Sequence, residues 1–442
     1  MKIQPAKSLQ GKITLPGDKS ISHRAALLSA MAEGETRIEN FATNADCAST
    51  LSCLQNLGVQ IRQENSIVFI KGVGKTGFQK PDSPLDCGNS GTTMRLLAGV
   101  LAGQNFDSIV TGDESLQKRP MRRIIEPLEM MGAKIESSNG CAPLKIHGRN
   151  PLQSILYDLP IASAQVKSCF LLAGLNAAGK SRVQNPKSKI RVPSSRNHTE
   201  LMLEYLGAEI EEDFLDFEDA FSHQVSIDGN SKLSARNLQI PSDVSSAAFF
   251  IVGAACLKNS DILIENIGFN PTRTAIIEVL RELGAKIEVL NKREVCNELI
   301  SDLRVQGKER FASDAQLNVI DGEIIPNLID EIPILAVFGT QIENGLEVRG
   351  AEELRVKESD RIAAIVENLR RMNARVEEFP DGFRVEKSHL QGARINSFGD
   401  HRIAMAFSIA ALLATGETEI IGAESASVSF PEFFRTLESV AK

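Results

Sequence analysis

The stretch LRELGAKI, residues Leu280–Ile287, is one copy of a pattern that returns along the whole chain. In each copy a Leu is followed four residues later by Gly, or by Asn or Ala in the weaker copies, and then usually by Ala and a β-branched residue. Apolar residues three and four apart predict an amphipathic helix, and the Gly or Asn just past its end predicts a left-handed cap before a strand. The capping position falls at Gly58, Gly132, Gly207, Gly284, Asn373 and Ala441, with periods of 74, 75, 77, 89 and 68 residues.

A second marker lies about 24 to 29 residues upstream of each cap, where an apolar helix stops before a short strand. A polar segment, here called an opening, begins each of these helices. The repeat is therefore opening, buried helix, strand, amphipathic helix and strand, and six copies predict an α/β protein packed as two groups of three. The openings are GDKSISHR (17–24), GNSGTTMR (88–95), SAQVKS (163–168), SDVSS (242–246), DEIP (330–333) and GDHR (399–402).

The places where the chain changes domain are marked by a near echo, since LPGDKS at Leu15–Ser20 resembles IPSDVS at Ile240–Ser245. The sixth repeat ends without a following strand, whereas strand-like KIQPA and GKITL precede the first repeat, so the N-terminus is expected to complete the second domain. Linkers at the two crossings would form a hinge that closes on a substrate and excludes water. The predicted domains are 16–240 and 1–15 plus 241–442, with hinge segments near 12–18 and 238–243.

Composition narrows the class of ligand. The 442 residues carry a net charge of −8, which argues against a nucleic-acid-binding protein with a broad basic face, so any anion must be held by a local cationic cluster. Seven cysteines without a CxxC pair, and a first twenty residues without an apolar signal core, favour free thiols in the cytoplasm. No apolar run approaches membrane-spanning length, and the six histidines never fall at metal-ligand spacing. We expect a cytoplasmic monomer that binds small molecules and holds no metal.

The openings themselves predict an anion site, because helix N-termini offer unpaired N–H groups and a partial positive charge. Ser, Asp and Asn there are in part ordinary N-caps, and ordinary capping is all that we expect of SDVSS. Lys and Arg in a first turn oppose the helix dipole, so Lys19, Arg24 and Arg402 need another reason, and an anionic ligand is the simplest. The openings that carry such residues contribute Lys19, Ser20, His23 and Arg24, then Asn89, Gly91, Thr92 and Arg95, then Ser163, Gln165 and Lys167, and finally Asp400, His401 and Arg402.

Two other segments are cationic, and two carboxylates stand near polar helix starts. Lys118 and Arg119 precede Pro120 in a loop that suits a phosphate or carboxylate clamp. The run LRVKESDRIAAI (354–365) alternates charge, which favours a solvated helix face over a site. Asp330 is an N-cap or, if its helix start shares the cationic site, a general base, with Glu358 as a candidate acid.

A match to a nucleotide-binding motif is set aside. GLNAAGKS, residues 174–181, has the spelling of a P-loop and would predict a kinase. A P-loop follows a strand and opens a helix, whereas Gly174 lies late in an apolar helix and a strand follows it. The order of elements is the reverse of what a P-loop requires.

The openings, read together with three other motifs, resemble the enolpyruvyl transferase family from about Lys2 to Phe434. The resemblance implies two domains, each an inside-out α/β barrel of three βαβαββ repeats, with substrate in the cleft between them. It also implies transfer of the carboxyvinyl group of phosphoenolpyruvate to the 5-hydroxyl of shikimate 3-phosphate, with release of phosphate and without a cofactor, in aromatic amino acid biosynthesis. The three other motifs are KRPM (118–121), SRNHTE (195–200) and LRVKESDRI (354–362).

Residue roles follow from the same resemblance. Asp330 is implied to take the hydroxyl proton, and Glu358 to protonate the methylene carbon, with Lys19 as the alternative acid. Shikimate 3-phosphate is implied to be bound by Lys19, Ser20, Arg24, Ser163, Gln165, Arg196, Asp330 and Lys357. Phosphoenolpyruvate is implied to be bound by Lys19, Gly91, Arg119, Gln165, Arg361 and Arg402.

The chain differs from many members of this family at one position, and its sequence disfavours two other functions. Many relatives carry a lysine before the final Phe-Pro pair, but Val428 and Ser429 stand there in this chain. The sister enzyme that uses UDP-N-acetylglucosamine carries a reactive cysteine in the loop equivalent to 111–123, and this chain has none there. A non-catalytic anion-binding protein is disfavoured because Lys19, Asp330, Glu358 and Arg402 are all present.

Overall fold

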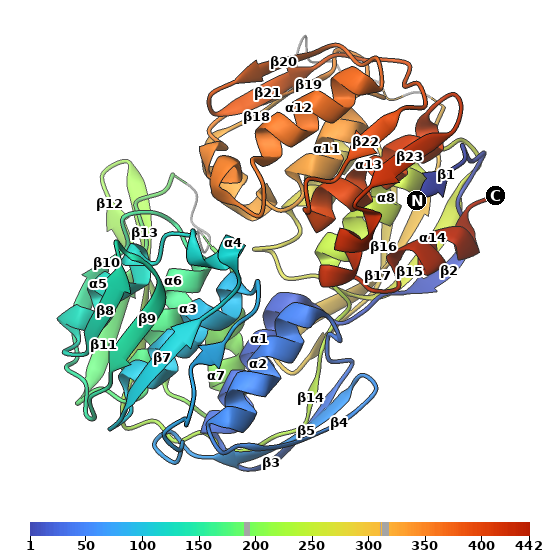
Figure 1. Cartoon of the computed structure of the whole chain (residues 1–442). Coiled ribbons are helices and arrows are strands. Elements are labelled where there is room, and N and C mark those ends of the chain that lie inside the picture. The colour runs from blue at the N-terminus through green and yellow to red at the C-terminus, as the bar shows by residue number, and fades with distance from the viewer. Residues whose placement is uncertain (190–194, 310, 312–317) are drawn as a thin grey trace. The chain divides into compact units, whose positions relative to one another are not determined.

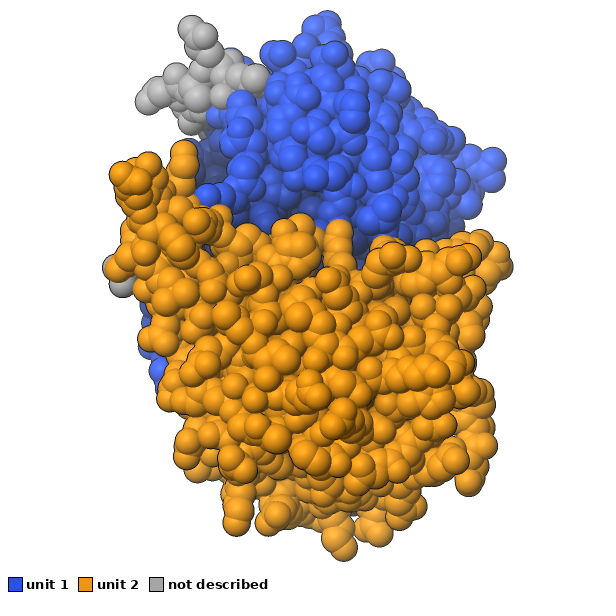
Figure 2. Space-filling view, turned by 90° about the vertical axis from the view of Figure 1, so that its left-hand side faces the viewer, with its two compact units in different colours: residues 1–16, 241–294, 299–442 blue, residues 17–240, 295–298 orange. Residues whose placement is uncertain are grey.

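The computed structural model describes residues 1–189, 195–309, 311 and 318–442, which divide into two compact units (Figure 2). Unit 2 comprises Gly17–Ile240 and Val295–Glu298, and unit 1 comprises Met1–Pro16, Pro241–Glu294 and Leu299–Lys442. The chain changes unit between Pro16 and Gly17 and between Ile240 and Pro241, inside the two segments expected to act as hinges. The sequence division had assigned residues 295–298 to the other domain. In the structure they group with unit 2, where Glu298 pairs with Nδ1 of His198 at 2.7 Å.

Unit 2 contains three repeats, each with one buried helix and one amphipathic helix (Figure 1). Its buried helices are α1 (Lys19–Met31), α3 (Gly91–Ala102) and α6 (Ala164–Gly174), and its other helices are α2 (Ala45–Asn56), the short α4 (Glu114–Gln117), α5 (Arg122–Met130) and α7 (His198–Tyr205). Its three sheets, in strand order, are β14 (Leu238–Gln239), β3 (Glu33–Glu39), β5 (Ile67–Val73) and β4 (Gln60–Glu64); β6 (Leu85–Asp86), β7 (Asp107–Thr111), β9 (Cys141–His147) and β8 (Lys134–Ser138); and β10 (Leu156–Asp158), β11 (Lys180–Gln184), β13 (Ala220–Asp228) and β12 (Ile210–Phe217).

Unit 1 repeats the same plan (Figure 1). Its buried helices are α8 (Val244–Cys256), α11 (Ile332–Gly339) and α13 (His401–Leu413), and its other helices are α9 (Ala275–Glu282), α10 (Ile325–Leu328), α12 (Arg361–Arg371), α14 (Phe433–Val440) and the 3-10 turns η1 (Gly322–Ile324), η2 (Glu352–Val356) and η3 (Ala423–Val428). Its sheets are β2 (Gln10–Thr14), β15 (Asp261–Gly268), β17 (Glu298–Gln306) and β16 (Lys286–Val295); β18 (Asn318–Ile320), β19 (Leu346–Val348), β21 (Gly382–Val385) and β20 (Val376–Phe379); and β1 (Lys2–Ile3), β23 (Thr418–Ile421) and β22 (Arg394–Asn396).

Each four-stranded sheet has the same internal order. A leading strand pairs in parallel with the strand after the buried helix, which then pairs antiparallel with a hairpin, as in β6, β7, β9 and β8. In two sheets the leading strand comes from far along the chain, since β2 pairs with β15 and β14 pairs with β3. The first strand of the chain, β1, pairs antiparallel with β23.

The predicted caps of the amphipathic helices are confirmed at five of the six positions. Gly58, Gly132, Gly207, Gly284 and Asn373 all have positive φ, between 64° and 98°, as a left-handed cap requires. The sixth position, Ala441, is extended, with φ −70° and ψ 131°, and forms an isolated bridge with Leu9 instead. Alanine carries a Cβ that disfavours the left-handed conformation, so this repeat ends differently.

Each unit has its own hydrophobic core, and the buried helices run through it. Every residue from Val244 to Ala255 of α8 and from His401 to Leu412 of α13 is buried. A helix that is buried on all faces has no solvated side for charged groups, and in α13 the charged and titratable residues, His401 and Arg402, lie in the first turn. The openings that the sequence marks are these first turns.

Close packing of the buried helices predicts a sharp response at one glycine. A Cβ at Gly99 of α3 would lie 2.2 Å from the backbone oxygen of Cys169 in α6, so Gly99→Ala forces two helices apart. We expect a loss of about 1 to 3 kcal/mol of unfolding free energy, seen as a lower midpoint of thermal unfolding by circular dichroism. Gly253→Ala in α8 is the matched control, because its Cβ would meet the end of the Leu9 side chain at 3.1 Å. An equal loss in both variants would contradict this account.

Candidate active site

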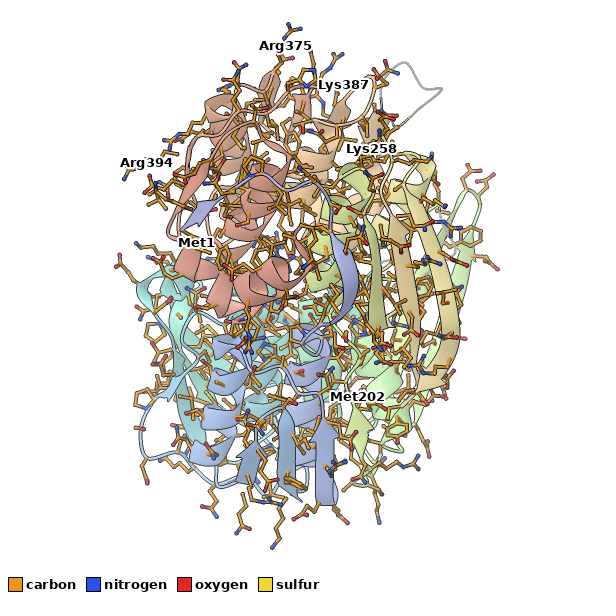
Figure 3. The ribbon with its side chains drawn as sticks, turned by 90° about the vertical axis from the view of Figure 1, so that its right-hand side faces the viewer. Met1, Met202, Lys258, Arg375, Lys387 and Arg394 are labelled. Carbon is orange, nitrogen blue, oxygen red and sulfur yellow. The ribbon has the colours of Figure 1, made fainter. Side chains whose placement is uncertain are left out.

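Some charged side chains of the protein are exposed to solvent, and others are buried. Arg375 and Arg394 point outward from the ribbon (Figure 3), and the side chains of Lys258, Arg375 and Arg394 are 60, 83 and 72% exposed. The side chain of Arg361 is 1% exposed and that of Lys167 is 0% exposed. Burying an unpaired charge is costly, so each buried cation requires a partner or a function.

The first opening places Lys19 at the start of α1. Asp18 caps this helix by accepting from the backbone N–H of Ile21 at 2.9 Å, and the ammonium group of Lys19 contacts Asp46 at the start of α2 at 2.9 Å. The side chains of Lys19 and Asp46 are 18 and 12% exposed, so the pair is shielded but reachable. A carboxylate at this distance holds the ammonium charged and directed toward one place.

His23 does not add a charge to this opening. It is fully enclosed in α1, where its Nδ1 is 2.7 Å from the hydroxyl of Thr50, and that hydroxyl is 2.7 Å from the hydroxyl of Thr93 in α3. Burial lowers the pKa of His23 from 6.5 to about 3, although Asp46 partly offsets the effect. The prediction that His23 strengthens an anion site is therefore wrong, because the ring is neutral and supplies no positive charge. It instead links α1, α2 and α3 through hydrogen bonds.

Arg24 keeps its charge but is largely enclosed by other groups. Its guanidinium donates to the carbonyl of Ser20 at 2.8 Å and to the hydroxyls of Thr199 and Ser168, both at 2.7 Å. Burial lowers the pKa of Arg24 to about 10, and Glu200 partly opposes this shift, so the group is a cation at neutral pH. Arg196 approaches the same opening and donates to the hydroxyl of Ser20 at 3.2 Å.

The second opening gathers two guanidiniums around a glycine. Gly91 is the first residue of α3, and a Cβ there would lie 2.8 Å from Nη1 of Arg95 and 3.6 Å from Nη1 of Arg119. Arg119 donates to the Asn89 side chain at 2.6 Å, and Arg95 donates to the Gln165 side chain at 2.7 Å. An anion at this helix start therefore meets backbone N–H groups and two cations without a side chain in the way.

Lys118 differs from its neighbour Arg119. Its side chain is 73% exposed, and its ammonium contacts Glu114 one helical turn away at 2.7 Å. The structure thus supports Arg119 and not Lys118 as the cation of this loop.

The third opening contributes Ser163 and Gln165 but not Lys167. Ser163 caps α6 by accepting from the backbone N–H of Val166, and the Gln165 amide donates to Thr92 at 3.0 Å. The ammonium of Lys167 contacts Glu200 at 2.5 Å, and both side chains are 0% exposed. The prediction that Lys167 strengthens an anion site is wrong, because its charge is committed to a buried structural pair.

In unit 1, Asp330 lies among three arginines. Its carboxylate oxygens are 3.5 Å from Nε of Arg402, 3.6 Å from Nη1 of Arg361 and 3.9 Å from Nη1 of Arg273. Arg402 also donates to the backbone carbonyl of Asp330 at 2.9 Å. Asp330 is not the N-cap of α11, since Glu331 occupies that position without a capping bond. The interpretation of Asp330 as an ordinary helix cap therefore does not hold.

Arg361 is the most strongly held of these cations. It donates from Nε to Asp400 at 2.8 Å and from Nη2 to Glu358 at 2.6 Å. Burial alone would lower its pKa, but the charges of Asp400, Glu358 and Asp330 outweigh burial and raise the pKa above its usual value. Asp400 responds in the opposite direction, because Arg361 and His401 hold its pKa low despite burial.

The segment LRVKESDRI divides between the two interpretations that its sequence allowed. Arg355 pairs with Asp360 and Glu378, as expected of a solvated face. Lys357 pairs with Glu353 at 3.0 Å in an i,i+4 contact, and its side chain is 24% exposed, so a ligand can still reach it. Arg361 begins α12 and points into the unit, so the favoured interpretation is wrong for this residue.

Three buried residues near Asp330 were not among the predicted site residues. Arg273 precedes α9, donates to the hydroxyl of Ser245 at 2.6 Å and approaches Asp330, while Ser245 in turn bonds to Glu331. The side chain of Glu331 is 1% exposed. Ser245 belongs to SDVSS, where only capping was expected. Arg273 lies outside the openings, so the repeat pattern gave no signal for it.

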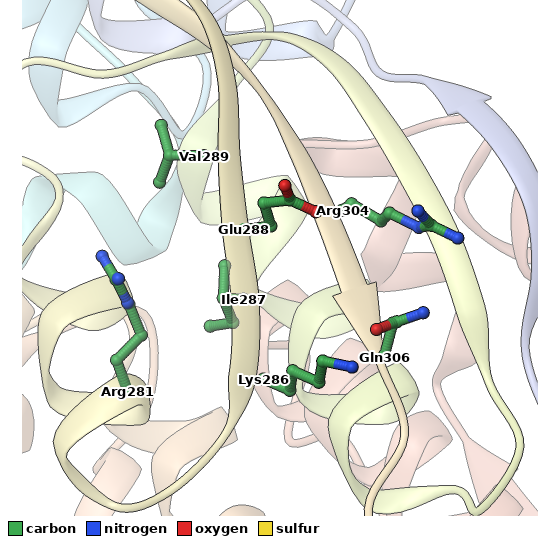
Figure 4. Close-up of a pocket in the computed structure, with 7 residues that line it drawn as sticks. All are labelled: Arg281, Lys286, Ile287, Glu288, Val289, Arg304 and Gln306. Carbon is green, nitrogen blue, oxygen red and sulfur yellow. The ribbon is translucent and has the colours of Figure 1, made fainter.

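A pocket on unit 1 is lined by other residues (Figure 4). It has a volume of about 420 Å³ and contains no residue of the predicted site. Its lining residues are Arg281, Lys286, Ile287, Glu288, Val289, Arg304 and Gln306.

The match to a P-loop at residues 174–181 is excluded by its structural context, because Gly174 ends α6 and Lys180–Gln184 forms β11.

Unit 2 presents helix starts with partly accessible cations, and unit 1 presents a carboxylate enclosed by guanidiniums. This is chemistry for binding and reacting compounds with several negative charges. The family model described as EPSP synthase (3-phosphoshikimate 1-carboxyvinyltransferase) matches residues 3–437. The chain belongs to the EPSP synthase family.

Individual relatives agree. A 3-phosphoshikimate 1-carboxyvinyltransferase from Solibacter usitatus is 47% identical over 443 residues, covering 100% of this chain and 99% of the relative. One from Synechocystis is 48% identical over 441 residues, covering 98% and 94%. The solved EPSP synthase of Acinetobacter baumannii is 41% identical, with a TM-score of 0.85 over 100% of this chain and 98% of the other.

These comparisons confirm the predicted family, fold class, enzyme class and activity. The enolpyruvyl transferase NikO from Streptomyces tendae, at 16% identity and a TM-score of 0.77 over 100% of this chain and 97% of the other, shows that the fold extends to distant sequences. Within the described ranges, no helix is both long and apolar enough to cross a membrane.

The buried neutral ring of His23 predicts a pH-dependent stability. The unfolded chain protonates His23 below pH 6.5 whereas the folded chain holds it neutral down to about pH 3, so the folded state loses stability as pH falls through this window. Between pH 7 and pH 5 the loss from this group is about 2 kcal/mol. Urea unfolding of His23→Gln, which keeps a hydrogen-bonding group near Thr50, should lack this part of the loss.

The control for this measurement is His147→Gln on β9, where the ring is partly exposed between Asp107 and Glu136. If the wild type and His23→Gln lose the same unfolding free energy between the two pH values, His23 is not buried in its neutral form.

Proposed function

We propose that the residues at the helix starts of both units carry out enolpyruvyl transfer to shikimate 3-phosphate. The observation that carries the assignment is the carboxylate of Asp330, which is 18% exposed and lies within 3.5 to 3.9 Å of three guanidiniums. Surrounding positive charge favours the ionised form of a carboxylate, which is the form that accepts a proton.

The cations divide between the two substrates. Shikimate 3-phosphate is bound by Lys19, Ser20, Arg24, Ser163, Gln165, Arg196, Asp330 and Lys357. Phosphoenolpyruvate is bound by Lys19, Gly91, Arg119, Gln165, Arg361 and Arg402. Because Arg24 donates to Ser20, Thr199 and Ser168, it holds in place the opening that presents Ser20. The substrate contacts only the part of the guanidinium that these three residues leave uncovered.

The reaction begins with two proton movements. Asp330 takes the proton of the 5-hydroxyl while the oxygen of that hydroxyl forms a bond to C2 of phosphoenolpyruvate, and an acid adds a proton to the methylene carbon C3. The product of this step is a tetrahedral intermediate. Loss of a proton from C3 and cleavage of the bond between C2 and the phosphate oxygen then regenerate the double bond and release phosphate. Arg119, Arg361 and Arg402 stabilise the negative charges throughout.

The acid is Glu358, with Lys19 as the alternative. Glu358 is 2.6 Å from Nη2 of Arg361, a contact that favours the ionised carboxylate. Negative groups of bound phosphoenolpyruvate compete for the same guanidinium, and this competition would allow Glu358 to take up the proton that it donates. Lys19 is already protonated beside Asp46 and needs no such change.

The reaction is tested by phosphate release. The chain is incubated with phosphoenolpyruvate and either shikimate 3-phosphate or UDP-N-acetylglucosamine, and separately with ATP in place of phosphoenolpyruvate. We expect phosphate release from phosphoenolpyruvate only when shikimate 3-phosphate is the acceptor. In Asp330→Asn we expect kcat to fall by a factor of about 10² to 10⁴. Silence with shikimate 3-phosphate would overturn the assignment, and consumption of ATP would favour a kinase.

A neighbouring pair of cations separates binding from general charge. Arg119→Met should lower kcat/KM for phosphoenolpyruvate by about 10² to 10³, because it removes a donor from the Gly91 helix start. Lys118→Met removes an equal charge from the adjacent, exposed position and should change kcat/KM by less than about twofold. Equal effects of the two substitutions in steady-state kinetics would show that Arg119 acts only through overall charge.

A further inference from the structure

Arg273 is held inside unit 1 by the turn that precedes α9. The side-chain oxygen of Asn270 accepts from the backbone N–H of Thr272 at 2.9 Å and from its hydroxyl at 2.7 Å, and the backbone N–H of Arg273 donates to the carbonyl of Asn270 at 2.8 Å. The side chain of Arg273 is 4% exposed. A guanidinium that is buried in this way must be stabilised by nearby negative charge.

The guanidinium contacts two elements of the unit, the start of α8 and the segment before α11. Nη2 donates to the hydroxyl of Ser245 in the first turn of α8 at 2.6 Å and lies 3.7 Å from the carboxylate of Asp243, the cap of that helix. Nη1 lies 3.9 Å from the carboxylate of Asp330. The hydroxyl of Ser245 passes the connection on, since it donates in a short hydrogen bond to Glu331.

We propose that Arg273 is a positioning residue for the reaction, one that keeps Asp330 ionised and fixes the adjacent Glu331 through Ser245. This inference rests on the proposed role of Asp330 as the base. It assigns a function to the fourth opening, SDVSS, which supplies both Asp243 and Ser245 to the network.

The need for such a residue follows from the charges around Asp330. Asp330 and Glu331 are consecutive carboxylates, and Asp243 adds a third negative charge near Arg273. Like charges in a poorly solvated place raise the pKa of at least one member, and a protonated Asp330 is no longer a base. Among the described residues, the charged and titratable groups that face Asp330 or its partners are Asp243, the cap of α8, Arg273 from the turn before α9, Glu331 at α11, Glu358 and Arg361 at α12, and Asp400, His401 and Arg402 at α13.

Arg273 differs from the other two guanidiniums near Asp330. Arg361 and Arg402 are assigned to phosphoenolpyruvate, so bound substrate shares their positive charge. Arg273 is committed to protein groups, with Ser245 as its closest partner. It therefore continues to stabilise the ionised form of Asp330 when both substrates are present.

The test is the pH dependence of kcat in Arg273→Gln. Activity requires ionised Asp330, so it falls as pH drops through the pKa of that group, and loss of a neighbouring cation raises this pKa. We expect the acid limb of the kcat profile to move to higher pH by about one unit. Arg273→Lys, which keeps the charge, should move it by less than half as much. Arg281→Gln, at an exposed position on α9, is the control and should leave the limb in place.

A purely structural role makes a different prediction. In that case Arg273→Gln lowers kcat or the midpoint of thermal unfolding while its acid limb superimposes on that of the wild type, and this outcome would overturn the proposal. If Arg273→Gln does not fold, the comparison is made in a Glu331→Gln background, which removes the carboxylate that the lost cation leaves without compensation. The limb of Arg273→Gln/Glu331→Gln should again lie at higher pH than that of Glu331→Gln alone.

Failure of this inference is distinguishable from failure of the proposed function. Asp330→Asn tests the base itself, so an active Asp330→Asn enzyme refutes the role of Asp330. An inactive Asp330→Asn enzyme combined with an unmoved acid limb in Arg273→Gln refutes only the role of Arg273.

Discussion

Helices that are buried on every face dominate the chemistry of this protein. In α8 and α13 an unbroken run of twelve or so residues is enclosed, from Val244 to Ala255 and from His401 to Leu412. Where such helices begin, the first backbone N–H groups have no partner within the helix and offer hydrogen-bond donors to other groups. The same first turns are where the unit can present positive potential. The same residues therefore cap the buried helices and offer groups that can bind an anion.

The pairing of charges decides which cations remain useful. Lys167 is as buried as any lysine can be, yet Glu200 neutralises it, and it stabilises the third repeat without reaching a ligand. His23 loses its charge altogether and serves as a hydrogen-bonding link between three helices. Lys19 keeps an accessible ammonium beside Asp46. Residue type at a helix start is therefore an incomplete guide, since the partner determines whether a charge is available.

The repeat pattern of the sequence was sufficient for the order of the buried and amphipathic helices, because a left-handed Gly or Asn ends each of the first five amphipathic helices. It was incomplete for the strands, since it predicted one strand after each amphipathic helix, whereas two neighbouring strands follow each of these five helices in the structure. It also located Lys19, Gly91, Asp330 and Arg402 at or beside helix starts, since cations in a first turn conflict with the helix dipole. The sequence did not distinguish Arg361, because alternating charge is as typical of a solvated face as of a site, and only burial separates Arg361 from Arg355. Arg273 was not found, because it is brought to Asp330 by the packing of a turn against two helices that are distant in sequence.

The strand order of the sheets has a consequence for how the chain acquires its structure during synthesis. Strand β2 ends at Thr14, but its parallel partner β15 begins only at Asp261, so the ribosome delivers the two halves of that pairing on the order of tens of seconds apart. In the interval the whole of 17–240 emerges, including β14, which closes the sheet of its own first repeat. Most of unit 2 can thus fold as the segment 17–240, which Val295–Glu298 join later, while unit 1 still waits for the strands that pair with its N-terminal segment. The N-terminal strands remain exposed edges during that time, and edges of this kind are where nascent chains engage chaperones or one another.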